Sequence, residues 1–272
     1  MELFRLLIGT VELRPYVFIF FAIYLAIAIT TIGLKRTIIF TVLAYTIAFL
    51  SEYSSSHGDS GIPFGVYRYV QSTRDRELWV AGVPFMDSLS FTFLSFVSWR
   101  LSVILLWPGN TRNRLASALS GGKFKVIWTA ALAGFLMMYL DIIIDPVALQ
   151  GKKWFLGEIY YYPGGGLYFG VTLANFAGWF VVCMVIVLAH SAIDSRLGER
   201  LRSMGVREFP LQWLAPAGLY FGILGFNLWV TFRIGETTMG LAGLFITLPL
   251  LLAVALSVLR GRFGTGPPIS DS

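Results

Sequence analysis

Long apolar runs separated by short polar segments dominate the pattern along this chain of 272 residues. A continuous apolar run of about 20 residues is the length that an α-helix needs to cross the hydrocarbon core of a bilayer. The pattern therefore predicts about seven membrane-spanning helices, over residues 15–34, 37–50, 88–107, 126–144, 167–190, 211–232 and 240–259. The second run is short for a full crossing, which indicates a tilted helix or one that extends at either end.

Composition supports the same fold class. The chain is 56% hydrophobic and only 13% charged, whereas a soluble domain carries about a quarter charged residues. The runs are continuous rather than alternating, so a membrane β-barrel is not expected. No internal repeat or linker divides the chain. We expect an all-α polytopic membrane protein forming one integral domain over residues 1–272, with a disordered tail over 260–272, in the cytoplasmic membrane of the cell.

The basic residues predict an orientation. The formal net charge is +6, and the Lys and Arg residues lie mostly in short loops, where they meet anionic lipid rather than nucleic acid. One set of alternate loops carries twelve of them and the other set carries eight. Because the richer set normally faces the cytoplasm, we expect the N-terminus outside and the C-terminus in the cytoplasm.

The acidic residues concentrate near the opposite membrane face. The loops that are poorer in Lys and Arg join the second span to the third, the fourth to the fifth, and the sixth to the seventh. This places a group of polar side chains near one face, namely Glu52, His57, Asp59, Asp87, Asp141, Asp145, Asn227 and Glu236.

Asp141 and Asp145 are the leading candidates for chemistry. They are four residues apart, so on a helix they share one face. An acid inside an apolar run normally faces the interior of a bundle or a wet cavity, and two close carboxyl groups away from bulk water keep at least one proton that can be donated. Two alternatives are open: structural salt bridges to Arg68 or Arg233, and a plain helix-ending signal at Asp145-Pro146.

Glu52 ends the second expected span. The turn-like sequence after it indicates a loop that folds back toward the bundle and carries His57 and Asp59. Histidine is the natural proton shuttle near neutral pH. A solvated helix cap at Glu52 and surface positions for His57 and Asp59 are the alternatives. We expect no metal site, because no H-x-x-x-H or C-x-x-C spacing occurs and His57 and His190 are predicted at opposite faces.

Residues 61–69 place Pro63 and Phe64 between two glycines, which allows a tight turn with close backbone approach. Phe64, Tyr67 and Tyr69 could then line a pocket. An interfacial aromatic belt is the alternative, and it fits at least as well as a pocket wall for Trp79, Trp154 and residues 160–162.

Three segments resemble motifs of a known family. Residues 60–69 (SGIPFGVYRY) are similar to a TGFPFGxYxY signature, residues 141–148 (DIIIDPVA) to DxxxDPVA, and residues 168–179 (YFGVTLANFAGW) to YxGVPxxNFxGW. Together they resemble the carotenoid biosynthesis membrane family that includes the CruF-type carotenoid hydratases, such as the bisanhydrobacterioruberin and γ-carotene hydratases. Thr172 stands where the pattern has Pro, and Ser60 where it has Thr.

The resemblance implies cofactor-free hydration of the terminal C1=C2 double bond of an acyclic carotenoid end group. Such a reaction needs a proton donor, stabilisation of a tertiary cation and one positioned water. We expect Asp141 as the leading donor, with Asp145 and Glu52 as partner acids. The expected secondary contributors and pocket walls are His57, Asp59, Asn175, Phe64, Tyr67, Tyr69 and Trp179.

Other functions fit parts of the pattern. A carotenoid or isoprenoid cyclase would use the same proton and cation chemistry without water. An integral prenyltransferase would need Mg²⁺ and a diphosphate site, and only one DxxxD occurs here. A proton-coupled transporter should show inverted repeats or broken helices. The expected partners are a lipophilic carotenoid within the bilayer, membrane lipids and other enzymes of carotenoid biosynthesis, with no nucleic acid.

Overall fold

The computed structural model describes residues 2–107, 122–198 and 212–263. Helices account for most of them: α1 (Glu2–Leu13), α2 (Pro15–Ile32), α3 (Leu34–His57), α4 (Phe85–Leu106), α6 (Gly122–Leu149), α7 (Leu173–Leu197), α8 (Ala215–Arg233) and α9 (Thr237–Phe263). Within the described residues, seven helices are long and apolar enough to cross a membrane, and α1 is not among them. The chain is an all-α polytopic membrane protein, as its hydropathy pattern predicts.

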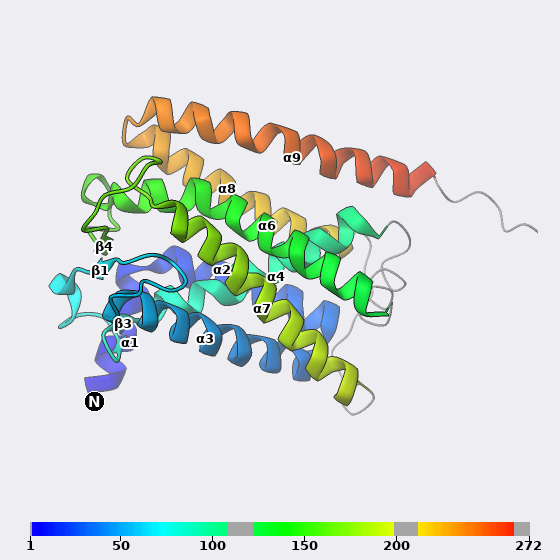
Figure 1. The fold of residues 1–272 in the computed structure, drawn as a ribbon, viewed down its shortest axis with the longest axis horizontal. Helices are drawn as coiled ribbons and strands as arrows, with labels where there is room; N and C mark the ends of the chain where they lie inside the picture. Colours follow the sequence, from blue (N-terminus) through cyan, green and yellow to red (C-terminus); the bar gives the residue numbers. More distant parts are fainter. Residues whose placement is uncertain (1, 108–121, 199–211, 264–272) are drawn as a thin grey trace, which may run out of the picture.

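Helix α4 lies at the centre of the bundle (Figure 1). It packs against α2, α3, α6 and α8. In its 18-residue apolar stretch 83% of the residues are buried, compared with 11% in the outermost helix α9. Serines at 88, 95, 98 and 102 are fully buried along α4. Small side chains let neighbouring helices approach closely inside a membrane, where lipid is as apolar as the helix surface. Two of the hydroxyls bond back to the helix: Ser95 donates to the Phe91 carbonyl at 2.5 Å and Ser102 to the Trp99 carbonyl at 2.7 Å.

Several helix ends differ from the sequence prediction. Helix α3 extends the expected run at both ends, so Glu52 lies inside a helix rather than at the start of a loop. Helix α6 continues through Pro146 to Leu149, so the Asp145-Pro146 pair does not end it. Helix α7 begins at Leu173, several residues later than expected, and α9 runs to Phe263 into the segment expected to be disordered. The remainder of that tail lies outside the described residues.

Short strands and turns close one end of the bundle. Strand β1 (Arg68–Tyr69) pairs antiparallel with β4 (Tyr160–Tyr161), with Arg68 opposite Tyr161 and Tyr69 opposite Tyr160. Strands β2 (Trp79–Val80) and β3 (Val83–Pro84) form a second pair. Two short 3-10 turns, η1 (Gln71–Thr73) and η2 (Gly151–Lys153), lie at this end, and η3 (Gln212–Leu214) lies at the other end, where Gln212 bonds the Thr30 carbonyl at 2.7 Å. The β1–β4 pair brings the loop after α3 next to the loop after α6.

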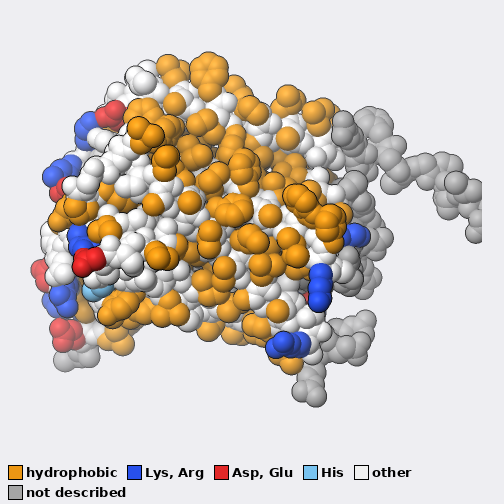
Figure 2. All heavy atoms as spheres, viewed as in Figure 1, with side chains coloured by type: hydrophobic (Ala, Val, Ile, Leu, Met, Phe, Trp, Pro, Cys, Tyr) orange, Lys and Arg blue, Asp and Glu red, His pale blue; other side chains and the backbone are white. Residues whose placement is uncertain are grey.

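Charge is confined to the two ends of the bundle in the view of Figure 2, with apolar side chains covering the middle. The closed end carries acids together with Lys and Arg, including a buried pair at 3.3 Å between Arg14 and Glu77. At the other end Arg36 binds Asp194 at 2.5 Å. The described connections α3–α4, α6–α7 and α8–α9 all lie at the closed end (Figure 1), while the direction of insertion is a proposal.

Candidate functional site

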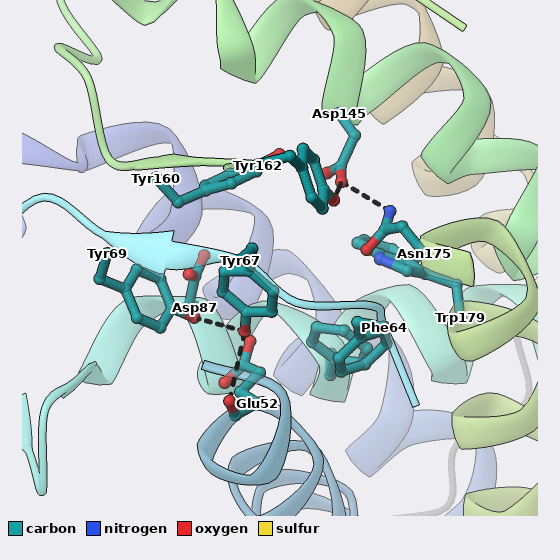
Figure 3. Close-up of a pocket in the computed structure, with 11 residues that line it drawn as sticks. Glu52, Phe64, Tyr67, Tyr69, Asp87, Asp145, Tyr160, Tyr162, Asn175 and Trp179 are labelled. Carbon is teal, nitrogen blue, oxygen red and sulfur yellow. Dashed lines mark hydrogen bonds between the residues drawn. The ribbon is translucent and has the colours of Figure 1, made fainter. Parts of the chain in front are cut away.

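A cavity lies beneath the β1–β4 pair, at the end of the bundle where the acids gather (Figure 3). We call it the acid cavity, and its lining residues are Glu52, Phe64, Tyr67, Tyr69, Asp87, Phe91, Asp145, Tyr160, Tyr162, Asn175 and Trp179. Its volume is about 50 Å³. Since one water molecule needs about 10–15 Å³ of such space, the cavity has room for several water molecules.

Glu52 enters the cavity from the last turns of α3. Its side chain is only 3% exposed, and its Oε2 atom accepts a hydrogen bond from the Ser88 hydroxyl at the start of α4. A buried carboxyl group needs hydrogen-bond donors to offset the loss of water. The partner is available because α3 and α4 pack against each other along their length.

Asp141 and Asp145 occupy successive turns of α6 and share one partner from α7. The Nδ2 atom of Asn175 donates to Oδ2 of Asp141 and to Oδ2 of Asp145, each at 2.7 Å. Asp145 also accepts from the Tyr162 hydroxyl at 3.4 Å. Asp141 is fully buried one turn deeper, and within the described residues its Oδ1 atom has no hydrogen-bond partner. Asp145 therefore faces the cavity and Asp141 lies behind it.

The salt-bridge alternative does not hold for these acids. In the described part of the chain, Arg68 lies 3.6 Å from Asp59 and bonds the Ser56 carbonyl, and Arg233 lies over the Trp229 ring. Neither guanidinium forms a salt bridge with Asp141 or Asp145. The acid pair is thus held by neutral donors rather than by cations.

Tyrosine hydroxyls cover the acids from the loop side. Tyr67 and Tyr69 lie two residues apart, on β1 and just before it, so both side chains point to the same side. Their hydroxyl oxygens lie 3.2 Å apart. Burial raises the pKa of both phenols well above the usual value, and the neighbouring acids act in the same direction. Both phenols therefore stay neutral and can donate or accept. Asp87, from the first turn of α4, lies beside Tyr69 (Figure 3).

Aromatic rings form the remaining wall. The rings of Phe91 and Trp179 lie 4.7 Å apart, and Phe64 lies 5.6 Å from Phe91. The turn carrying Phe64 approaches α7 at Gly178, where a Cβ atom would lie 2.5 Å from the Phe64 ring and 2.8 Å from the Pro63 carbonyl oxygen. A side chain at position 178 would push this turn away from the cavity.

Most of the predicted site residues meet at this cavity. Glu52, Asp145, Phe64, Tyr67, Tyr69, Asn175 and Trp179 line it, while Asp141 supports it from behind. His57 and Asp59 do not reach it. His57 stacks on Tyr53 at 4.4 Å, and the Asp59 side chain is fully exposed. Because α3 continues to His57, the five residues after Glu52 turn it about 140° away from that acid around the helix.

The sequence pattern does not assign Asp87, Tyr160 and Tyr162 to the site. It places Asp87 near the same membrane face, and for the two tyrosines an interfacial belt fits at least as well as a pocket wall. A usable signal exists for the tyrosines: positions 67 and 69, like 160 and 162, are two apart, so each pair points to one side of an extended segment. Nothing in the sequence indicates that these two segments pair.

The acids of the cavity do not form a recognisable ligand set for a metal. Within residues 2–107, 122–198 and 212–263, no group of three His, Cys, Asp or Glu side chains is arranged to hold an ion. What the cavity offers chemically is several carboxyl groups, neutral phenols and a carboxamide beside aromatic faces.

Comparison with known proteins places the chain in a family. A sequence model described as carotenoid biosynthesis protein matches residues 13–253, which include every residue of the acid cavity. No curated protein and no solved structure matches the chain. The family match spans most of the chain and all seven membrane-spanning helices begin within it. This protein belongs to the carotenoid biosynthesis protein family.

Proposed function

We propose that this protein hydrates the terminal C1=C2 double bond of an acyclic carotenoid end group to give a tertiary alcohol. One observation carries the proposal: carboxyl groups from α3, α4 and α6 converge on one aromatic-walled cavity with room for water. Membership of the family supports a role in carotenoid biosynthesis. Hydration is the reaction that this set of side chains fits best, since it requires only acid, base and water.

Asp145 is the proton donor in this proposal. Ionising both Asp141 and Asp145 would place two negative charges on adjacent helical turns, bridged by one carboxamide, in a buried setting. Such a pair retains a proton. Asp141 was the leading candidate from the sequence, but it does not line the acid cavity, so its role becomes that of a positioning residue behind Asp145.

The aromatic wall supports the cationic intermediate. Proton transfer from Asp145 to C2 leaves a tertiary cation at C1. Phe91 and Trp179 line the cavity with their rings 4.7 Å apart, and aromatic ring faces attract cations by their quadrupole. The carboxylate left on Asp145 supplies a compensating negative charge nearby.

Water then completes the reaction. An oxygen lone pair of a water molecule forms the C1–O bond, and Glu52 accepts the proton that this water loses. Glu52 is suited to hold water because its carboxyl group lines the cavity beside the Ser88 hydroxyl, while the Tyr67 hydroxyl donates to the Glu52 backbone carbonyl at 3.5 Å. Proton exchange through the cavity waters and phenols returns a proton from Glu52 to Asp145. The net change is the addition of one water to one double bond.

Expression in a lycopene-producing host, followed by mass analysis of the pigments, tests the proposal. A gain of one or two waters relative to lycopene is the expected result. Pigments of unchanged mass and altered absorption would contradict hydration. They would favour a cyclase, the second candidate, because the same acids and ring faces could protonate the alkene and guide ring closure without water.

A prenyltransferase differs in its need for Mg²⁺. Activity of the purified protein should survive exhaustive dialysis against a chelator if hydration is correct. Loss of activity that only added Mg²⁺ restores would contradict our scheme and favour the prenyltransferase reading.

A further inference from the structure

A second, mostly apolar cavity adjoins the acid cavity. The two share five lining residues: Asp87, Phe91, Asp145, Tyr160 and Trp179. We call the second cavity the apolar groove. Its other walls come from α2, α4, α6, α8 and the loop after α6, and include Tyr16, Phe20, Phe93, Ala148, Trp154 and Ile223. Asp87 and Asp145 therefore face both spaces, whereas Glu52, Tyr67 and Tyr69 line only the acid cavity.

Aromatic rings surround the groove where α2 approaches α8. Tyr16 stacks on Phe226 at 5.3 Å and lies 5.8 Å from Phe155. Trp154 lies 5.0 Å from Phe155. The outer rings reach the surface, since Phe155 is 56% and Trp229 57% exposed. Because α2 and α8 cross the membrane, the surface where they meet faces lipid. The aromatic rings therefore lie between the lipid and the groove.

We infer that the apolar groove holds the unsaturated, methyl-branched end of an isoprenoid chain, which reaches it from the lipid phase between α2 and α8 and places its last double bond between Asp87 and Asp145. This inference deepens the proposed function and rests on it. The site then has two sides. The isoprenoid chain lies in the apolar groove, and water lies in the part of the acid cavity that is lined by Glu52, Tyr67 and Tyr69.

The chemistry of the inner wall identifies the occupant. A saturated acyl chain would gain only apolar contact there and would bring a methyl end against two carboxyl groups. A branched alkene has π electrons that can accept a proton, and its branch point carries the resulting charge. Trp179, Phe91 and Tyr160 lie on the wall shared by both cavities, where ring faces can stabilise that charge.

The division also keeps water in place. The groove side is lined by large apolar side chains such as Phe93, which is 3% exposed, and Ile223, which is 2% exposed. Water therefore reaches the alkene from the side of Glu52, across the chain end from the groove. The water then meets the cation at C1 from the side that carries Glu52, the group that accepts its proton.

Narrowing the groove tests the inference. Ala148 lies three residues after Asp145, lines the groove and is partly exposed, so Ala148→Phe fills the groove without overfilling the core. Ile223→Phe narrows it from α8, and Leu241→Phe on the exposed face of α9 is the matched control, with Leu241 48% exposed. Lycopene binding to the purified protein is measured by the shift of its absorption and by induced circular dichroism.

We expect both groove variants to weaken lycopene binding at least tenfold and the control to bind like the unmodified protein. Unchanged binding in both groove variants would overturn the inference. If both variants fail to fold, a linear polyene with a terminal diazirine is applied to the unmodified protein. Labelling of groove-lining peptides from α2, α4, α6, α8 or the loop after α6 supports the inference, and labelling confined to other segments overturns it.

The two proposals fail separately. If lycopene binds in the groove but no water is added to it, the hydration proposal falls and the groove assignment stands. If hydration occurs and proceeds equally well in Ala148→Phe and Ile223→Phe, the groove assignment falls and the hydration proposal stands.

Discussion

The Nδ2 atom of Asn175 lies 2.7 Å from Oδ2 of Asp145 and at the same distance from Oδ2 of Asp141. One carboxamide thus ties α7 to two successive turns of α6. It fixes the side chain of Asp145 toward the acid cavity and leaves Asp141 behind it. This arrangement assigns different roles to two acids that look equivalent in the sequence motif.

Asp145→Asn should abolish most of the hydration activity. The amide keeps the shape of the side chain but cannot deliver the proton, so we expect the rate to fall by about 100-fold or more. Product formed per amount of folded protein, measured by chromatography and mass analysis, checks this. Asp59→Asn is the comparison, because the Asp59 side chain is exposed outside the cavity and its loss should leave the rate unchanged. A strong loss in Asp59→Asn with an active Asp145→Asn would contradict the site.

Asp141→Asn should be less damaging than Asp145→Asn. An amide at position 141 keeps a polar partner beside Asn175 and removes no group that lines the cavity, so we expect about a tenfold loss in kcat with little change in KM. Steady-state kinetics on both variants provide the comparison. A larger loss in Asp141→Asn than in Asp145→Asn would restore Asp141 as the donor and contradict our assignment.

Gly178→Ala should destabilise the protein. The new methyl group would meet the Phe64 ring at 2.5 Å and the Pro63 carbonyl oxygen at 2.8 Å, so the turn must shift. Overpacking of this kind costs about 1–3 kcal/mol, and we expect a lower melting temperature in detergent together with reduced activity. Gly222→Ala is the matched control on α8, where nothing lies within 4 Å of the added atom. Equal melting temperatures for the two variants would contradict the close approach of the turn to α7.

The orientation proposed from the basic loops can be measured with single cysteines. Cys183 is the one native cysteine and is buried, so a Cys183→Ser variant provides a cysteine-free background for these substitutions. In intact cells, a membrane-impermeant maleimide should label Asp59→Cys, at the end of the acid cavity. Lys123→Cys should react only after the cells are opened. The reverse pattern would place the N-terminus and the acid cavity on the cytoplasmic side.

Much of the fold could be predicted from hydropathy because a membrane helix must be both long and apolar. Each of the seven expected runs corresponds to one observed helix. The ends were less predictable. Glu52 and His57 are polar, yet α3 continues through them, since helical backbone at the membrane boundary satisfies its own hydrogen bonds whatever its side chains are. Pro146 is a different case: it has no N–H and cannot bond the Ile142 carbonyl, yet α6 continues through it to Leu149.

The site could be predicted in part. Asp141, Asp145 and Glu52 are recognisable from the sequence because placing an acid in an apolar run costs free energy in a membrane. Such acids therefore indicate a functional site. Asp87 did not stand out, because an acid in the first turn of a helix is also an ordinary helix start. Tyr160 and Tyr162 join the site only through the pairing of β1 with β4, a contact between segments about ninety residues apart that no local pattern specifies.

The most direct test of the central claim follows the oxygen of water. Purified protein is incubated with lycopene in water labelled with heavy oxygen, and the extracted pigments are analysed by mass spectrometry and absorption. Our account predicts a product that has gained one labelled water per modified end, with the label on the terminal tertiary carbon. A changed pigment that carries no labelled oxygen would contradict hydration.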